Sequence, residues 1–571
     1  MADLKVNLNL KSKQQNTYDA IVVGSGVSGG WAAKELCEKG LKVLMLDKGW
    51  NLEHGKYEEA FKKPWETKYR GRITDKQRQS HPFLSRDYPY NEHSEKYWMN
   101  DEDSPYAEQK RFDWYRPNIV GGKSIMWGRQ SYRLSEMDFE ANAKEGIAID
   151  WPVRYKEIAP WYDYVEQFAG ISGQNEGLPQ LPDGKFLPPM EMNCLEKHIA
   201  GKIKANYKDR VMTMGRVANL TQSINGRGAC QYRNLCSRGC NYGAYFSTQS
   251  STLPAAMKTG NLTVRPLSVV SSVIFDEKTQ KATGVTVIDA DSKETIEFFA
   301  KIIFLNGSTL GTTLLMMNST SNRFPNGLGN DSDQLGRNLM DHHFRCGASG
   351  SAEGLGFEDQ YYFGRRANGI YIPRFRNIAK NDRDYIRGFG YQGGASRTGW
   401  QRGIAEMGVG KDFKESLIAP GNWTFGMTGF GECLPYQENR VTLDKNKLDK
   451  WGLPTLNFDC EFKENETKMR KDMMNDAAEM LESAGLKDIK TYDNGSFPGM
   501  AIHEMGTARM GKDPKTSVLN GFNQIHAVKN VFVTDGSFMT SAGCQNPSLG
   551  YMAFTARACD YAVKEMKKGN I

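Results

Sequence analysis

Residues 18–49, YDAIVVGSGVSGGWAAKELCEKGLKVLMLDKG, decide the fold of this chain. Residues 19–23 are a short apolar run with β-branched side chains, which predicts a buried strand, and residues 42–46 predict a second one. Between the two runs lie a G-x-G-x-x-G sequence at residues 24–29 and a helical segment. This order of strand, glycine turn, helix and strand is typical of a unit that binds a dinucleotide.

Each glycine of the motif has a predicted task. Gly24 permits the tight turn, Gly26 lets a pyrophosphate approach the backbone, and Gly29 lets the helix pack against the strand. Free N–H groups and the dipole at the start of the helix then hold the phosphates. Asp47 closes the second strand, where a carboxylate can accept ribose hydroxyls. The alternative is a glycine-rich turn in another α/β fold, but two strands, a helix and an acid together favour a dinucleotide.

The overall composition excludes several classes of protein. The chain has 571 residues, of which 39% are hydrophobic and 25% charged, as in a soluble globular protein with room for two or more cores. The net charge of +7, without a basic run that contains aromatics, gives no reason to expect nucleic acid. No apolar stretch approaches the roughly 18 residues of a membrane span. The polar residues 1–17 lack the apolar core of a signal peptide, so we expect a cytoplasmic protein if the chain acts alone.

Further strands are expected to join the same nucleotide-binding unit. Residues 301–306, KIIFLN, predict a buried strand that runs into a glycine turn and a helix. Residues 262–287 alternate enough to form strands of a small sheet. Residues 530–534 predict a strand that ends at Asp535 and Gly536.

The chain ends in a predicted helix, which has Pro547 at its first position and Asn546 as its N-cap. Upstream, residues 116–128 contain the paired glycines Gly121 and Gly122. They indicate either an ordinary turn or a loop that passes close to a flavin ring.

Residues 346–496 have a different character. They contain aromatic-rich strands at 361–363, 371–375 and 423–430 and an amphipathic helix at 465–485. We predict an α/β fold with a Rossmann-like domain at 17–345, a second, mostly antiparallel α+β domain at 346–496, and a return to the first domain at 497–571.

Three of the ten cysteines lie close together in the sequence. They follow the pattern Cys230-x5-Cys236-x3-Cys240 within the glycine-punctuated loop 226–245. Three thiolates on one loop can hold a [3Fe–4S] cluster. The alternatives are reduced structural thiols, a zinc site with a distant fourth ligand, or one disulfide with a spare thiol.

Five blocks of sequence, in order, resemble the glucose–methanol–choline (GMC) oxidoreductases. The blocks are residues 23–29 with Asp47, the pair Gly121-Gly122, and residues 306–315, 503–507 and 535–547. The resemblance implies an FAD-binding α/β domain, a substrate domain on an antiparallel sheet, and oxidation of an alcohol. It assigns these residues to the cofactor: Gly24, Gly26, Val27, Ser28, Gly29, Asp47, Lys48, Gly121, Gly122, Ser124, Val269, Asn306, Gly307, Asp535, Gly536, Asn546 and Pro547.

Two positions qualify the resemblance. The acid after the second strand is usually Glu in this family and is Asp47 here, one methylene shorter but long enough to reach the ribose. Some relatives attach FAD to a histidine in the paired-glycine loop. Because residues 121–129 contain no histidine, we expect FAD to be bound non-covalently.

The resemblance also implies a catalytic pair. His503 precedes the Gly-Thr of its block, where the family places a histidine beside the flavin, and Asn546 matches the partner before the last helix. Alcohol oxidation removes a hydride from carbon and a proton from oxygen, and a neutral imidazole can take that proton near physiological pH. Asn546 can orient the hydroxyl without competing for its proton.

The cysteine spacing resembles the catalytic subunits of bacterial FAD-dependent sugar dehydrogenases in this family. This resemblance implies a [3Fe–4S] cluster that passes single electrons to a c-type cytochrome. It also implies a small partner subunit with an export signal, which would carry the chain to the periplasm.

Within this group we favour oxidation of the C3 hydroxyl of D-glucosides to 3-keto sugars. Glucose 1-dehydrogenase and gluconate 2-dehydrogenase are close alternatives. An oxygen-using pyranose or C-glycoside oxidase and a non-catalytic flavoprotein are further ones.

Overall fold

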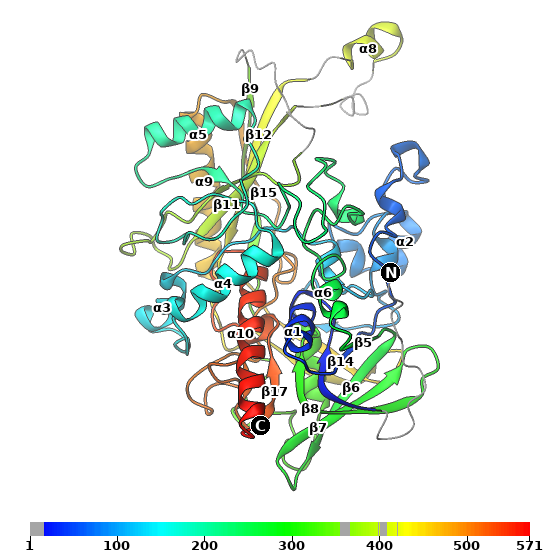
Figure 1. The fold of residues 1–571 in the computed structure, drawn as a ribbon. Coiled ribbons are helices and arrows are strands. Elements are labelled where there is room, and N and C mark those ends of the chain that lie inside the picture. Colours follow the sequence, from blue (N-terminus) through cyan, green and yellow to red (C-terminus); the bar gives the residue numbers. More distant parts are fainter. Residues whose placement is uncertain (1–15, 354–365, 398, 400–407, 419–420) are drawn as a thin grey trace.

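The computed structural model describes residues 16–353, 366–397, 399, 408–418 and 421–571. Two large sheets dominate it, one at each end of the molecule (Figure 1). A sheet of eight strands lies at one end, with the C-terminus beside it, and a sheet of six strands forms the opposite end. Within this described part, no helix has both the length and the apolar character needed to cross a membrane.

The eight-stranded sheet begins with the predicted βαβ unit. β1 (Thr17–Val23) pairs in parallel with β2 (Val43–Leu46), and α1 (Val27–Glu38) connects them. β1 also pairs in parallel with β8 (Thr295–Leu305), which in turn pairs with β17 (Val528–Val533). The other strands are β5 (Leu262–Arg265), β6 (Ser268–Asp276), β7 (Lys281–Asp289) and β16 (Gln524–Ile525). The predicted Rossmann-like fold class is thereby confirmed.

Steric contacts explain two glycines of the motif. A Cβ atom on Gly29 would lie 1.9 Å from the carbonyl oxygen of Gly24, so only glycine lets α1 approach the turn after β1. Gly24 has φ +94°, and a Cβ atom there would lie 2.2 Å from the carbonyl oxygen of Asn306. Replacement of either glycine by a residue with a side chain would therefore force the backbone to move.

The strands predicted at residues 262–287 do not form a small separate sheet. β5 adds to the main sheet in parallel with β2. β6 and β7 form a hairpin, and β7 joins the main sheet because it pairs antiparallel with β8. The long β8 makes this possible, since its first half pairs with β7 and its second half with β17.

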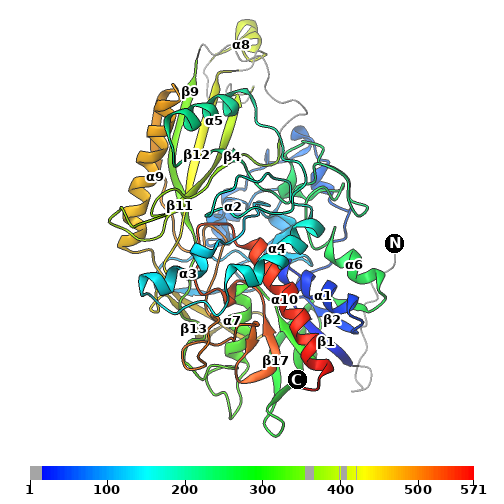
Figure 2. The same cartoon turned by 60° about the vertical axis from the view of Figure 1, so that its left-hand side comes forward.

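The second sheet has six strands in the order β15-β9-β12-β11-β10-β4, and all its pairs are antiparallel. Its strands are β4 (Thr213–Met214), β9 (His343–Ala352), β10 (Ile370–Ile372), β11 (Phe389–Arg397), β12 (Trp423–Gly431) and β15 (Lys487–Asp493). α9 (Glu464–Ser483) packs along one face, as Figure 2 shows. β4 comes from outside the predicted range 346–496, and the strand predicted at 361–363 lies outside the described residues.

A third, small sheet and the remaining helices complete the described structure. The small sheet contains β3 (Ala107–Glu108), β13 (Arg440–Leu448) and β14 (Pro454–Asp459). The other helices are α2 (Asp75–Ser80), α3 (Glu136–Glu145), α4 (Tyr155–Ala169), α5 (Cys194–Asn206), α6 (Thr252–Lys258), α7 (Thr309–Asn318), α8 (Lys411–Ser416) and α10 (Ser548–Lys567). α10 packs between α1 and α4 (Figures 1 and 2).

The start of α10 differs from the prediction by one position. The helix begins at Ser548, Pro547 is its N-cap, and no side chain caps it. Asn546 is therefore not the N-cap. Its side chain points instead to two other residues, described below.

Candidate active site

A cavity of about 690 Å³ lies where the parallel strands of the eight-stranded sheet end. β1, β2, β8 and β17 each deliver residues to it just after their last position, because the carboxyl ends of parallel strands meet at one edge of a sheet. These predicted cofactor and catalytic residues line it: Gly24, Gly26, Val27, Ser28, Asp47, Lys48, Gly122, Val269, Asn306, Gly307, His503, Asp535, Gly536, Asn546 and Pro547.

Three predicted cofactor residues, Gly29, Gly121 and Ser124, do not line the cavity. The Gly121 N–H donates a 2.7 Å hydrogen bond to the Ser25 hydroxyl. The Ser124 hydroxyl donates to the Gly121 carbonyl oxygen and accepts a 3.0 Å bond from the Thr248 N–H. These residues therefore position the paired-glycine loop against the first helix rather than facing a ligand.

Three helices begin at the wall of the cavity. Val27 and Ser28 open α1, Thr309 opens α7, and Ser548 opens α10, and all four residues line the cavity. Each helix N-terminus carries a partial positive charge and unpaired N–H groups. Their convergence favours a ligand with negative charge at more than one point.

The residues of the cavity fit FAD. A Cβ atom built on Gly26 would meet nothing within 4 Å, so the backbone there faces open space where a phosphate can approach. The Asn306 amide nitrogen is buried and has no hydrogen-bond partner in the structure, which leaves a donor for a ligand. Asp47 accepts N–H bonds of 2.9 Å from Ser25 and 2.8 Å from Gly49 and still lines the cavity.

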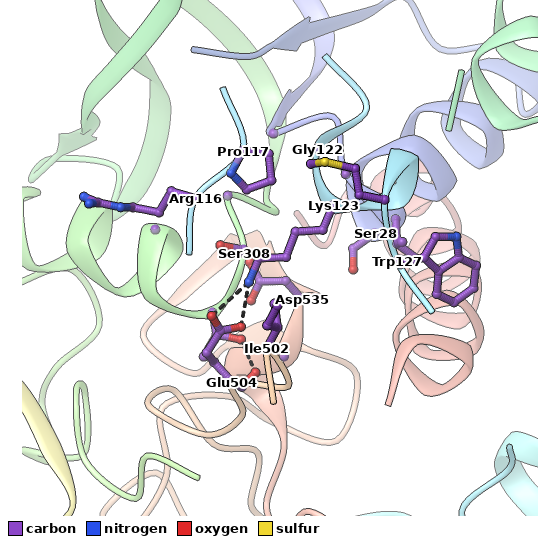
Figure 3. Close-up of a pocket in the computed structure, with 18 of the residues that line it drawn as sticks. Ser28, Arg116, Pro117, Gly122, Lys123, Trp127, Ser308, Ile502, Glu504 and Asp535 are labelled. Carbon is purple, nitrogen blue, oxygen red and sulfur yellow. Dashed lines mark hydrogen bonds and ion pairs between the residues drawn. The ribbon is translucent and has the colours of Figure 1, made fainter. Parts of the chain in front are cut away.

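One ion pair crosses the cavity wall. Lys123 Nζ lies 2.8 and 2.9 Å from the two carboxylate oxygens of Glu504, as Figure 3 shows. Lys123 belongs to the paired-glycine loop, and Glu504 follows His503 in the chain. The pair thus joins the loop to the segment that presents the candidate base.

A second histidine contacts His503. His342 Nε2 lies 2.8 Å from the Gly543 carbonyl oxygen, which can only accept, so this nitrogen carries the hydrogen. Burial lowers the pKa of His342 to about 4, so its ring is neutral and its Nδ1 carries no hydrogen. His342 Nδ1 lies 2.9 Å from His503 Nδ1 and must accept from it.

This contact determines the tautomer of His503. Burial holds the pKa of His503 well below its usual value, followed by the unfavourable interactions that its protonated form would make with His342 and with the Lys123 ammonium, so the ring is neutral with one hydrogen. That hydrogen lies on Nδ1, and Nε2 therefore has a free lone pair. The Asn546 amide nitrogen lies 3.2 Å from Nε2 and donates to it.

The same chain of hydrogen bonds continues into the six-stranded sheet. Gln392 on β11 donates a 2.6 Å bond to the amide oxygen of Asn546. This fixes the Asn546 amide with its nitrogen toward His503. The predicted pair His503 and Asn546 is thus in contact, and both ends of the pair are held by other side chains.

The backbone around His503 is held as well. The buried Asp341 carboxylate accepts N–H bonds of 3.0 Å from His503 and 3.1 Å from Ala501. Burial and the nearby Glu504 raise the pKa of Asp341 to about 7, against the lowering effect of these bonds. Ile502 has φ +63°, a strained conformation for a β-branched residue, directly before His503.

No sequence pattern identified His342 and Gln392 as residues of the site. His342 lies 161 residues before His503 and reaches it only because it precedes β9, a strand of the second sheet. The adjacent residues Asp341, His342 and His343 are the one signal that could have drawn attention to this position, because they gather three titratable groups. No comparable signal marks Gln392.

The cysteine loop does not form a metal site in this structure. Cys236 lines the cavity, but Cys230 and Cys240 do not, and all three thiols are free and half-buried. Burial, with smaller contributions from the other two cysteines, raises the pKa of Cys230 to about 11. In the described part of the chain, no three His, Cys, Asp or Glu side chains are placed to hold a metal ion. The predicted [3Fe–4S] ligand set of Cys230, Cys236 and Cys240 is thus not present in this conformation.

Comparison with known proteins gives consistent matches over most of the chain. The family profiles described as GMC oxidoreductase match residues 18–344 and 435–555. The chain is 30% identical to 2-methyl-1,2-propanediol dehydrogenase of Mycolicibacterium austroafricanum, over 95% of this chain and 94% of the relative. It is 24% identical to the fructose dehydrogenase large subunit of Gluconobacter japonicus, over 98% of this chain and 100% of the relative. It is 23% identical to the gluconate 2-dehydrogenase flavoprotein of Pantoea cypripedii, over 93% of this chain and 91% of the relative.

Solved structures share the fold at low sequence identity. Pyridoxine 4-oxidase from Mesorbium loti superposes with a TM-score of 0.61 and 17% identity, over 96% of this chain and 99% of the other. At this identity the likeness describes the fold alone.

Proposed function

The chain belongs to the GMC oxidoreductase family, whose members bind FAD and act on CH–OH groups, and from this premise we propose that it is a sugar dehydrogenase with His503 as the base. The names of two relatives, a fructose dehydrogenase and a gluconate 2-dehydrogenase, support a sugar as the substrate. The observation that carries the proposal is the neutral His503 ring, whose Nε2 lone pair is left free by the bond between its Nδ1 and His342.

Each side chain of the site has a separate role in the proposed oxidation. FAD, when bound, supplies the acceptor for the hydride from the alcohol carbon. His503 Nε2 accepts the hydroxyl proton, in place of the hydrogen bond that it receives from Asn546 in the structure. The Asn546 amide can then donate to the substrate oxygen, while Gln392 keeps the amide from turning. The N-terminus of α10 favours negative charge in the cavity.

We further propose FAD bound without a covalent link, since residues 121–129 contain no histidine. Denaturation in acid should release all of the flavin into the supernatant. Flavin that stays with the precipitated protein would contradict this proposal.

The finer substrate assignment is the C3 hydroxyl of D-glucosides, which gives 3-keto sugars. It rests on the resemblance of the sequence, and glucose 1-dehydrogenase and gluconate 2-dehydrogenase activities are the alternatives. A screen of sugars by anaerobic bleaching of the flavin, with products identified by NMR, decides among them. If no sugar bleaches the flavin while a simple diol does, the proposed substrate class is wrong.

An oxygen-using pyranose or C-glycoside oxidase is the second candidate. The two enzymes differ in the acceptor that reoxidises the flavin. Turnover with an artificial electron acceptor but without peroxide formation supports the dehydrogenase. Equal turnover with oxygen alone supports the oxidase.

An electron exit through a [3Fe–4S] cluster to a c-type cytochrome is a separate proposal. It rests on the spacing of Cys230, Cys236 and Cys240. Iron analysis of protein purified without air tests it, with Cys236→Ser as the variant. About three irons per chain and a three-iron EPR signal support the cluster. Iron-free protein that reduces a cytochrome at full rate excludes it.

A small partner subunit with an export signal, and with it a periplasmic location, is proposed on the same resemblance. The name of one relative, the large subunit of a fructose dehydrogenase, supports an assembly of unlike subunits. Co-purification from a periplasmic extract tests both proposals. Recovery of the chain alone from the cytoplasm would contradict them.

A further inference from the structure

A second cavity, of about 510 Å³, opens on the six-stranded sheet beside the first. Strands β9, β11, β12 and β15 supply its wall, and Gln392 and Phe430 line both cavities. Its volume lies in the range of small-molecule sites. Since FAD would fill much of the first cavity, the second offers space for the part of a substrate that is not oxidised.

An aromatic path joins the two cavities. The ring centroid of Phe430 lies 6.4 Å from that of His503. Phe344, on β9, stacks on Phe430 at 5.2 Å with an angle of 22° between the rings. A ligand that extends from His503 into the second cavity therefore passes along two aromatic rings, which offer apolar surface to the C–H faces of a sugar ring.

The polar groups of the second cavity suit hydroxyls. The Arg345 guanidinium contacts Met500 Sδ at 3.4 Å, and no carboxylate among the described residues pairs with it. Tyr492 donates a 3.0 Å bond to the Met427 carbonyl oxygen and lies 2.7 Å from the Thr428 hydroxyl. Arg345 thus offers donors, and the two hydroxyls keep free acceptor lone pairs.

The two cavities are also linked by a hydrogen bond. Gln392 lines the second cavity and donates to the amide oxygen of Asn546, which contacts His503. A group bound in the second cavity therefore touches a side chain that positions the candidate catalytic pair. Binding in the second cavity is thereby coupled, through Gln392, to the orientation of Asn546 at His503.

We propose that the second cavity is a subsite for the neighbouring sugar ring of a disaccharide or glycoside whose other ring is oxidised at His503. The proposal rests on the sugar dehydrogenase function above and adds the size of its substrate. It assigns Arg345 and Thr428 as specificity-determining residues.

The experiment compares cellobiose with glucose in the FAD-containing protein. Anaerobic flavin reduction gives kcat/KM for each sugar, and calorimetry gives the affinity for cellobiose without any need for turnover. The variants are Arg345→Gln and Thr428→Val. Thr424→Val is the matched control, because Thr424 lies on β12, has the same residue type and exposure pattern, and is outside the cavity.

The wild-type protein should prefer cellobiose to glucose. Arg345→Gln should lower the cellobiose-to-glucose ratio of kcat/KM and the affinity for cellobiose by about tenfold, as expected when hydrogen bonds to a charged group are lost. Arg345→Lys, which keeps the charge but loses the fork of donors, should recover only part of the effect. Thr424→Val should leave the ratio unchanged.

Two results would overturn the subsite. One is a ratio that stays the same in Arg345→Gln and Thr428→Val while both variants keep the wild-type flavin spectrum. The other is cellobiose binding no tighter than glucose in calorimetry. Tight cellobiose binding without flavin bleaching by any sugar would instead support the subsite and contradict the proposed function.

Discussion

The Nδ1 atoms of His342 and His503 lie 2.9 Å apart, and the hydrogen between them belongs to His503. The assignment follows from the other nitrogen of His342, which donates to the Gly543 carbonyl oxygen. A residue that directly precedes β9 of the second sheet thus determines which nitrogen of the candidate base is free to accept a proton.

Substitution of His342 should slow flavin reduction without loss of FAD. In His342→Leu, His503 loses its acceptor and can adopt either tautomer, so we expect a decrease of roughly tenfold, the value of one hydrogen bond. His342→Asn can still donate to Gly543 and accept from His503, and it should recover much of the rate. Stopped-flow reduction measures the rate, and ¹⁵N NMR reports the tautomer of His503.

A merely structural role for His342 predicts a different outcome. Both variants would then lose thermal stability together, and the ¹⁵N shifts of His503 would remain those of the wild-type tautomer. That result would contradict the positioning role.

Removal of the base should have a larger effect. We expect His503→Ala to lower the rate of flavin reduction by roughly two to four orders of magnitude, the usual range for a lost general base. Asn546→Ala should be milder, since it removes a hydrogen bond rather than the proton acceptor. His526→Ala is the control, because His526 contacts Ser517 away from the cavity. A His503→Ala rate near that of the wild type would mean that another group takes the proton.

The acid limb of the pH profile, where activity is lost as the pH falls, should lie below the usual pKa range of histidine. Burial, His342 and Lys123 lower the pKa of His503, so the neutral form that accepts the proton persists below pH 6.5. Activity should therefore fall only when the pH drops below that value. Lys123→Met removes a positive charge and leaves Glu504 unpaired, so the pKa of His503 should rise and the acid limb should move to higher pH.

The pH dependence of flavin reduction checks this prediction. Lys123→Arg keeps the charge beside Glu504 and should retain the wild-type acid limb. An acid limb that does not move in Lys123→Met would show that this charge has no influence on the base.

Local patterns made the nucleotide-binding half of the fold predictable. β1, the glycine turn, α1 and β2 occupy one short stretch, and the close approach of Gly29 to Gly24 lies within it, although the contact of Gly24 with Asn306 does not. The second sheet was predictable in kind but not in extent, because β4 joins it from a distant segment through pairing with β10. Strand pairing between distant segments leaves no local pattern.

The residues of the candidate site were likewise predictable only in part. His503 and Asn546 could be identified by resemblance, and they are in contact. The predicted N-cap role of Asn546 is wrong, because α10 begins at Ser548 with Pro547 as its N-cap, and a boundary shift of one residue cannot be read from the sequence. Gln392 and His342 reach the pair from β11 and from the segment before β9. Their identity as partners is a property of the packed sheet, which no single stretch of sequence encodes.

Gly26→Ala should give a folded protein that binds FAD weakly. A Cβ atom at this position meets no protein atom within 4 Å, and its φ of −65° is acceptable for alanine, so the fold itself should tolerate the methyl group. The open space is where the cofactor phosphates are expected to approach the backbone, so the methyl group should lower the affinity for FAD by at least about tenfold. Gly201→Ala is the matched control, since its Cβ atom also meets nothing within 4 Å but lies on α5, away from the cavity. FAD content after gel filtration and circular dichroism of both variants measure the two effects. Full FAD content in Gly26→Ala would place the phosphates elsewhere, and loss of secondary structure in this variant alone would mean that the glycine serves the fold rather than the cofactor.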